Sequence, residues 1–449
     1  MALAQAVWQA EKAIGHDDNA TTIQDVTNPG NKPEWGDSSE TMKALAWYGK
    51  NDVRIVDTPK PKILEPRDVI LKITGSTVCG SDLHLLHGSV IEMQKGDILG
   101  HEFCGVVDEM GSEVTNLKKG DRVVASFQIA CGRCYHCDQK ISSQCERTNA
   151  NTIENAMYGG RTAGMFGYSH FTGGFAGGQS EYTRVPYGDV NLLKLPDDVP
   201  DEKGLYLSDV ICTSWNCVVD TGVKKDDVVA IWGAGPIGQM CSDFAFLNGA
   251  KRVIMIDSVQ WRLDLLKEKD PRVETVNFSK LSGANPVVAK LKEMVDGRGP
   301  DIALECAAGE YAKSLAHKAE IALGLETDTS EILNEMIMSV RNYGSVGVTG
   351  VYVGFTNHFN IGSLMERGIR LIGNGQAPVH LYWEDLLKRI QTGEIDPLRM
   401  LSHRVRLEDL DKVYYKFDKK QDGLQKVFVE TKFSAPAAPG TPALTKYDY

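Results

Sequence analysis

The sequence predicts an α/β protein in which a β-rich domain precedes a doubly wound parallel sheet. From residue 42 to about 200, short apolar strands alternate with glycine-containing turns, as in domains built from many short strands. From about residue 209 the pattern changes to buried strands separated by helices, such as Val228–Trp232 and Arg252–Asp257. Strand–helix–strand repeats imply right-handed crossovers and therefore a parallel sheet.

These patterns divide the chain into a polar N-terminal extension (1–41), a β-rich domain (42–208 and 376–432), a parallel-sheet domain (209–375) and a C-terminal tail (433–449). We expect the extension to wrap on the surface or to be partly disordered, with a short helix at Ala4–Ile14. A helix at Trp383–Gln391 and a strand at Lys426–Val429 should return to the β-rich domain. Residues 307–343 should be helical with an insertion, and the tail should be loose or lie along a partner.

Bulk composition argues against nucleic-acid and membrane partners. The 449 residues are 42% hydrophobic and carry a net charge of −11, which repels phosphate backbones and anionic lipids. Apolar runs are strand length, far short of a membrane span. The start of the chain resembles neither a secretory signal nor a basic transit peptide, so we expect a cytosolic protein.

Residues 156–182 combine eight glycines with several aromatic residues. Glycine at this density indicates unusual backbone conformations or a close approach of the backbone to another group. A surface loop is the simplest interpretation, but the aromatic residues predict that the segment packs over a site or a neighbouring subunit.

A G-x-G-x-x-G motif follows the strand Val228–Trp232 and opens a helix, which is the setting of a dinucleotide-binding turn. The expected cofactor contacts are Gly233, Gly235, Pro236, Ile237 and Gly238. Asp257 ends the next strand, where its carboxylate can bind the adenosine ribose and would repel a 2′-phosphate. This favours NAD over NADP. Arg262 either flanks the adenine or ribose or is a solvated helix charge.

Four cysteines follow a C-x2-C-x2-C-x7-C spacing: Cys131, Cys134, Cys137 and Cys145. Four thiolates this close in sequence can form a closed tetrahedral structural zinc site. A disulfide pair is disfavoured by the expected cytosolic location, and an iron–sulfur cluster is not excluded by the spacing.

A second, dispersed set consists of Cys79, His101 and Asp209. A thiolate, an imidazole and a carboxylate can hold a catalytic zinc and leave one position open. Asp82 could orient His101, and Glu102 could approach the metal during ligand exchange. Cys212 competes with Asp209 as the third ligand.

A zinc-bound alcohol is acidified, and its proton must reach solvent. Ser81 lies two residues after Cys79, and His84 carries an imidazole that titrates near neutral pH. A relay from Ser81 through the cofactor ribose to His84 is therefore expected. Ser81 could also cap the following helix.

The chain resembles zinc-dependent medium-chain alcohol dehydrogenases from about Met42 to Lys432. The resemblance rests on Cys79–His84, Gly100–Glu102, the four-cysteine lobe and Gly233–Gly238, in that order. Ser208-Asp209 and the glycine-rich stretch at 173–182 are most similar to the glutathione-independent formaldehyde dehydrogenase branch, although Trp215-Asn216 stands where that branch often has an aromatic–histidine pair.

The resemblance implies a GroES-like catalytic domain interrupted by a Rossmann domain, two zinc ions and NAD per chain, and a homodimer or homotetramer. It assigns Cys79, His101 and Asp209 to catalytic zinc and the four-cysteine lobe to structural zinc. Ser81 and His84 become the proton relay. Thr213 is expected near the nicotinamide and Lys426 against the pyrophosphate.

The expected function is hydride transfer between NAD and an alcohol or hydrated aldehyde, with formaldehyde dehydrogenation and aldehyde dismutation both possible. Alternatives are a metabolite-specific biosynthetic dehydrogenase and a non-catalytic NAD-binding protein on the same scaffold.

Overall fold

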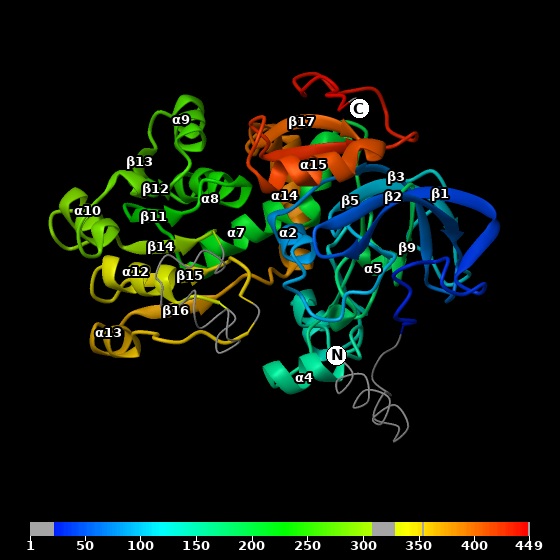
Figure 1. Ribbon diagram of the computed structural model, residues 1–449, viewed down its shortest axis with the longest axis horizontal. Coiled ribbons are helices and arrows are strands. Elements are labelled where there is room, and N and C mark those ends of the chain that lie inside the picture. Colours follow the sequence, from blue (N-terminus) through cyan, green and yellow to red (C-terminus); the bar gives the residue numbers. More distant parts are fainter. Residues whose placement is uncertain (1–21, 308–327, 353, 448–449) are drawn as a thin grey trace. The chain divides into compact units, whose positions relative to one another are not determined.

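The computed structural model describes residues 22–307, 328–352 and 354–447. The chain forms two compact units, of which the first comprises Met1–Cys212 with Pro378–Tyr449 and the second Thr213–Ala377. The first junction thus falls a few residues later than the sequence predicts, so that Asp209 belongs to the first unit. Each unit is built around its own sheet (Figure 1).

A seven-stranded sheet forms the framework of the first unit, in the order β10-β6-β5-β3-β18-β17, with β9 also paired to β3. Its strands are β3 (Val69–Ser76), β5 (Phe103–Met110), β6 (Arg122–Ala125), β9 (Tyr182–Val185), β10 (Leu192–Lys194), β17 (Leu401–Arg406) and β18 (Lys426–Glu430). Val69, Leu71 and Ile73 alternate along β3 and are buried in the core together with Phe103. This period-two pattern places one face of β3 in the interior.

Smaller elements complete the first unit. The strands are β1 (Gly36–Gly49), β2 (Asp52–Pro61), β4 (Asp97–Ile98), β7 (Gln128–Ile129) and β8 (Gly164–Met165). The helices are α2 (Gly80–Leu86), α3 (Tyr135–Asp138), α4 (Thr152–Tyr158), α5 (Gly188–Asn191), α6 (Asp201–Gly204), α14 (Val379–Gln391) and α15 (Leu410–Asp418), while α7 (Val210–Thr221) begins in this unit. The helix and strand expected near residues 383 and 426 are α14 and β18 of this unit.

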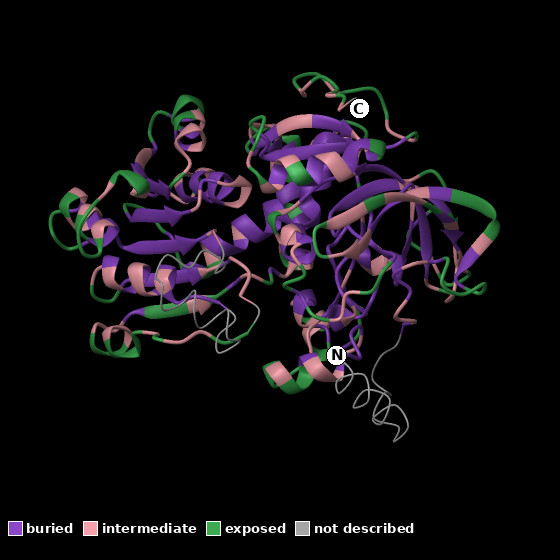
Figure 2. Cartoon of the chain, in the orientation of Figure 1, coloured by how far each residue is buried: buried purple, intermediate pink, exposed green. Residues whose placement is uncertain are grey.

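The second unit is a six-stranded parallel sheet in the order β13-β12-β11-β14-β15-β16. This order is that of the Rossmann dinucleotide-binding fold. The strands are β11 (Val228–Trp232), β12 (Arg252–Asp257), β13 (Glu274–Asn277), β14 (Ile302–Glu305), β15 (Ser345–Val348) and β16 (Arg370–Gly373). The helices are α8 (Pro236–Leu247), α9 (Gln260–Lys269), α10 (Pro286–Met294), α12 (Glu331–Ser339) and α13 (Ile361–Glu366). β11, β12 and β14 are almost entirely buried, whereas the edge strand β16 is largely exposed (Figure 2).

Both ends of the chain depart from the sequence expectations where they are described. β1 begins at Gly36 rather than at residue 42, and Val26 is buried and forms a bridge to Phe175. The tail is not loose, because Leu444 pairs with Arg404 of β17. The polar composition of the two ends did not reveal these contacts, because their partners lie far away in the sequence. The expected helix at Ala4–Ile14 and much of the expected insertion, residues 308–327, lie outside the described residues.

The glycine-rich segment packs closely within the first unit, as its aromatic residues suggested. A Cβ atom on Gly177 would lie 2.2 Å from the carbonyl oxygen of Leu99, and one on Gly178 would lie 2.3 Å from the ring of Phe103. Both distances are too short for any side chain, so glycine is required for this approach. The segment therefore supports the turn that carries His101.

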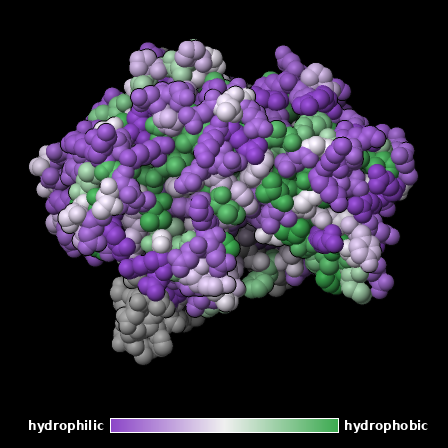
Figure 3. Space-filling model, turned by 180° about the vertical axis from the view of Figure 1, so that it is seen from behind, coloured by the Kyte–Doolittle hydropathy of each residue, from purple (hydrophilic) through white to green (hydrophobic). Residues whose placement is uncertain are grey.

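Hydrophilic side chains predominate on the face of the described chain shown in Figure 3, with hydrophobic groups visible in smaller patches between them. None of the described helices has the length and apolar character needed to cross a membrane.

His170 fastens the described N-terminal segment to the first unit. Its Nδ1 lies 2.9 Å from the Asp25 carboxylate and its Nε2 lies 3.2 Å from that of Asp97. Burial alone would lower the pKa of His170, but Asp25 and Asp97 raise it to about 9. A protonated imidazole between two carboxylates therefore holds Asp25 in place.

We expect His170→Gln to lower the free energy of unfolding by roughly 2–3 kcal/mol near pH 6, because the ion pairs are lost. The folded pKa of His170 exceeds its unfolded value of about 6.5, so its contribution is fully present below that pH and disappears as pH rises through about 9. Urea unfolding at pH 6 and pH 9.5 measures both effects. His87→Gln, which removes a half-exposed pair with Asp418, is the control. An equal loss of unfolding free energy at pH 6 and pH 9.5 would contradict a role for protonated His170 in holding Asp25.

Candidate metal and cofactor sites

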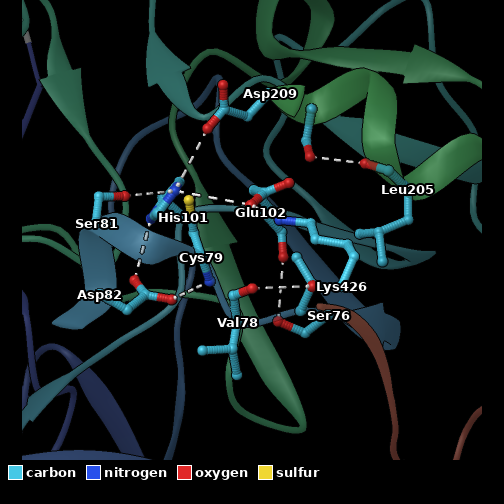
Figure 4. A network of polar contacts seen from close by, with 12 residues as sticks. Ser76, Val78, Cys79, Ser81, Asp82, His101, Glu102, Leu205, Asp209 and Lys426 are labelled. Carbon is cyan, nitrogen blue, oxygen red and sulfur yellow. Dashed lines mark hydrogen bonds and ion pairs between the residues drawn. The ribbon is translucent and has the colours of Figure 1, made fainter. Parts of the chain in front are cut away.

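Four metal-binding side chains converge in the interior of the first unit. One ligand atom from each of Cys79, His101, Glu102 and Asp209 lies within 4.8 Å of the others (Figure 4). Cys79 is partly buried and the other three are buried. The structure therefore brings together the dispersed set predicted from the sequence and adds Glu102 to it.

Local backbone structure positions these side chains. Cys79 is the N-cap of α2, and its backbone N–H donates to the Asp82 carboxylate at 2.9 Å. His101 follows Gly100, whose φ of +98° favours glycine and whose absent side chain leaves room for Gln179. Asp209 occupies the break between a short 3-10 helix and α7. Each ligand thus sits at the end of an element, where side chains are free to converge.

Asp82 lies behind the His101 ring, in a place from which it could orient the imidazole. Asp82 Oδ1 lies 3.3 Å from His101 Nδ1, whereas Asp209 Oδ2 lies 3.5 Å from the opposite nitrogen, Nε2. The second oxygen of Asp82 accepts from the Cys79 backbone and from Gln179 Nε2. A carboxylate behind one imidazole nitrogen leaves the other nitrogen directed at the cluster, the arrangement typical of metal-binding histidines.

Lys426 provides the cationic partner that the sequence did not suggest. Its Nζ lies 2.5 Å from Glu102 Oε1, and both side chains are only 1% exposed. In the structure β18 directs the amine of Lys426 to Glu102, and the expected role of Lys426 against the cofactor pyrophosphate stays a prediction. No sequence signal reveals a pair 324 residues apart.

Negative groups outnumber cations around His101. Burial alone would lower the pKa of His101, but Asp82 and Asp209 raise it well above its ordinary value. Burial raises the pKa of Glu102 against the opposing effect of Lys426. Glu102 Oε2 is also buried without a hydrogen bond among the described residues. A partly buried thiol, a buried imidazole and buried carboxylates, one with a free oxygen, fit a divalent cation.

The side chain of Cys212, the alternative third ligand, is directed at the Leu207 carbonyl group and not at the metal cluster. Its Sγ donates to the Leu207 carbonyl oxygen at 3.2 Å, and it does not belong to the cluster. Burial and the nearby Asp209 raise the pKa of the Cys212 thiol well above its ordinary value. The geometry therefore favours Asp209 over Cys212.

Ser81 and His84, the expected relay, both lie on α2. Ser81 Oγ lies 3.5 Å from His101 Nε2, beside the cluster. His84 is three residues further along the helix and is 5% exposed. Residues three apart share a helix face, so the two side chains can act on the same region. The Ser81 side chain is not the helix cap, because that position belongs to Cys79.

The four cysteines of the lobe lie close together in the structure. Ligand atoms of Cys131, Cys134, Cys137 and Cys145 lie within 4.8 Å of one another, and the sulfurs of Cys134 and Cys145 are 3.9 Å apart. The Cys131 backbone N–H donates to Cys145 Sγ. Four converging sulfurs with a backbone donor fit a closed zinc site rather than separate disulfides.

The glycine motif in the second unit has the form needed for a dinucleotide. Gly233 has φ +103°, and a Cβ on Gly238 would lie 1.8 Å from the Gly233 carbonyl oxygen. A Cβ on Gly235 would meet nothing within 4 Å, so the space over this residue is open to a ligand. Pro236 opens α8, whose first N–H groups form an anion site. β11, where the strand order reverses, carries this turn at its carboxyl end.

Asp257 is held beside the same turn. Its carboxylate accepts from the Ala234 N–H at 2.7 Å and from the Val259 N–H at 2.8 Å. The Arg262 guanidinium lies over the Trp261 ring. Thr213 is buried at the start of the second unit, and the nearby Asn216 donates to the Asn374 carbonyl oxygen. Roles for Thr213 and Arg262 in cofactor binding stay predictions.

We expect Lys426→Met to lower the free energy of unfolding by about 3–5 kcal/mol, because it leaves Glu102 buried without its cation. The double variant Lys426→Met with Glu102→Gln should lower the free energy of unfolding by less than Lys426→Met alone, because no carboxylate is then left without its cation. Urea unfolding of the full chain measures both. Lys416→Ala, which removes a more exposed pair with Asp422, should leave stability nearly unchanged because water screens that pair. A double variant no more stable than Lys426→Met would argue against the pair.

Comparison with known proteins supplies the family. A family model for the alcohol dehydrogenase GroES-like domain matches residues 65–197. A zinc-type alcohol dehydrogenase-like protein of Schizosaccharomyces pombe is 39% identical over 423 residues, covering 94% of this chain and 96% of the relative. Formaldehyde dismutase of Pseudomonas putida is 33% identical, covering 84% and 95%.

An alcohol dehydrogenase of Thermus sp. ATN1 matches in structure with a TM-score of 0.72 at 29% identity, covering 87% of this chain and 100% of that chain. These likenesses confirm the predicted combination of a GroES-like domain and a Rossmann domain. The chain belongs to the zinc-type alcohol dehydrogenase family and is an oxidoreductase.

Proposed function

We propose that this oxidoreductase transfers hydride between an alcohol or hydrated aldehyde and NAD, using zinc held by Cys79, His101 and Asp209. The observation that carries the proposal is the buried cluster of these three residues with Glu102. The donor set and the free Oε2 of Glu102 fit zinc. Zinc bound there would polarise the substrate oxygen and lower the pKa of its hydroxyl, and NAD would accept the hydride.

The residues of the chain would prepare and protect this site. Asp82 holds the His101 ring so that Nε2 faces the other ligands. Lys426 neutralises Glu102 and keeps it in the interior. Ser81 would accept the substrate proton, and His84 would pass it on with the help of a cofactor ribose hydroxyl. The buried position of His101 and Glu102 excludes bulk water from the metal side.

The four-cysteine lobe would hold a second zinc ion with a structural role. Four sulfur ligands leave no position for substrate, so this ion would stabilise the loop from Cys131 to Cys145. Purified protein should therefore contain zinc at both sites, and Cys79→Ser should remove only the ion at the catalytic site. Two further expectations, a homodimer or homotetramer and a cytosolic location, stay predictions.

The likeness to formaldehyde dismutase favours a second reaction at the same site, aldehyde dismutation. Two aldehydes and one water then give one alcohol and one carboxylic acid, with NAD reduced in one half-reaction and reoxidised in the other. A cofactor that stays bound between turnovers would show no net accumulation of NADH.

The deciding experiment incubates zinc-loaded protein with NAD and short alcohols or formaldehyde, and separately with formaldehyde alone. NADH formation indicates dehydrogenation, whereas equal amounts of methanol and formate without NADH indicate dismutation. Cys79→Ser should abolish either reaction. Zinc-loaded protein that binds NAD but yields no product from a broad panel of alcohols and aldehydes would instead indicate a non-catalytic binding protein.

We expect Asp209→Asn to lower kcat/KM by at least about 100-fold, since even residues that only support metal ligands cost 10–100-fold. The amide keeps the shape of the side chain but lacks the charge. Cys212→Ser is the matched control and should keep most of the activity. Steady-state kinetics and zinc content measure the two variants. Loss of zinc from Cys212→Ser alone would reverse the ligand assignment.

We expect Asp257→Asn to raise the kcat/KM ratio of NADP to NAD by at least about tenfold, because the carboxylate that repels a 2′-phosphate is removed. The amide oxygen can still accept one of the two backbone hydrogen bonds that hold the turn. Kinetics with each cofactor test this, and Asp264→Asn on α9 provides the surface control. An unchanged ratio would show that Asp257 does not select the cofactor.

A further inference from the structure

Three cysteines from separate elements of the second unit form a cluster that the catalytic chemistry does not use. Cys217 lies on α7, Cys241 on α8 and Cys306 directly after β14. Their sulfur atoms all lie within 4.8 Å of one another, and those of Cys241 and Cys306 are 3.8 Å apart. Cys217 and Cys241 are fully buried, whereas Cys306 is partly exposed.

The spacing of these sulfurs fits ligands of one metal ion. Sulfur ligands at about 2.3 Å from a tetrahedral zinc are separated by about 3.8 Å. Cys241 and Cys306 match this separation, as do Cys134 and Cys145 of the four-cysteine lobe at 3.9 Å. A disulfide requires a sulfur–sulfur bond of about 2.05 Å and would join only two of the three.

The surroundings also suit a thiophilic ion. Among the described residues, the group contains sulfur ligands and no carboxylate or imidazole, a set that selects soft or borderline metals such as zinc. Partly exposed Cys306 gives the ion a route to the two buried sulfurs. All three sulfurs would bind as thiolates, so the site with a divalent ion would carry one net negative charge, and partly exposed Cys306 is where water can solvate that charge.

We propose that Cys217, Cys241 and Cys306 form a third zinc site, distinct from the catalytic and four-cysteine sites. Three protein ligands leave the fourth position for water on the side of Cys306. The site joins α7, α8 and the end of β14, three elements that meet beside the dinucleotide turn. It does not depend on the proposed reaction or substrate.

An ion at this site acts on its immediate surroundings, so we assign its effect to the glycine turn. The Cys306 N–H donates to the Trp232 carbonyl oxygen at 2.8 Å, and a Cβ on Gly233 would lie 2.8 Å from the Cys306 carbonyl oxygen. The backbone of Cys306 thus packs directly against Gly233. An ion bound to its sulfur holds this backbone in place and thereby supports the turn.

Metal analysis of the full-length protein, purified under reducing conditions and equilibrated with zinc before dialysis, tests the site. We expect about three zinc ions per chain in the natural sequence and about two in Cys217→Ser/Cys241→Ser. Cys104→Ser, which changes a buried cysteine outside all three clusters, should keep about three. Cys79→Ser should lose the catalytic ion and activity but retain the third site, which separates failure of this proposal from failure of the proposed function.

A second measurement does not depend on the folding of a variant. Zinc should slow alkylation of Cys306 in the natural sequence by at least about tenfold, and a chelator should restore the rate, as peptide mass spectrometry would record. The proposal is overturned if the zinc-equilibrated protein contains only two zinc ions per chain, or if the alkylation rate of Cys306 is the same with and without zinc. A disulfide between Cys241 and Cys306, seen as linked peptides two hydrogens lighter in the reduced, zinc-equilibrated protein, would overturn it as well.

Discussion

Excess negative charge in a dry interior is the constraint on which the first unit depends. Asp82, Glu102 and Asp209 surround one imidazole, and the buried ammonium of Lys426 pairs with Glu102. Carboxylates removed from water are stable only when paired, hydrogen-bonded or bound to a metal. The fold meets this requirement with a fixed histidine, an ion pair from β18 and a set of ligands suited to a cation. The same charged groups therefore affect both the stability of the first unit and its ability to bind a metal ion.

Close backbone packing makes this concentration of charge possible. Gly177 and Gly178 approach the turn before Phe103 so tightly that no side chain fits between them. Gln179 follows at once, and its amide donates to Asp82 while its oxygen accepts from the Tyr414 hydroxyl at 2.8 Å. The end of the glycine-rich segment, residues 177–179, thus packs directly behind the metal cluster, which explains why glycine is needed at its first two positions.

The sequence predicts what depends on short spacing or distinctive chemistry. The glycine turn and the four-cysteine lobe follow from residue types with few other uses in these settings. The choice of Asp209 to complete the dispersed set with Cys79 and His101 rested mainly on the family resemblance. The sequence does not predict contacts made only by folding. Lys426 meets Glu102 across 324 residues, and Cys217, Cys241 and Cys306 are too widely spaced to suggest a cluster. The tail was misjudged because its proline-rich composition says nothing of its contacts with Arg404.

The interrupted first unit has a consequence for synthesis on the ribosome. β3 emerges early, but its neighbour β18 is made last, so the sheet keeps an open edge while the whole second unit is translated. The cluster ligands are complete long before Lys426 exists to balance Glu102. A nascent chain of that length therefore contains the acidic and thiol ligands but not their ammonium partner. Cation binding at that stage would bring these ligands together before Lys426 is made, and metal supply would then affect the yield of folded protein as well as catalysis.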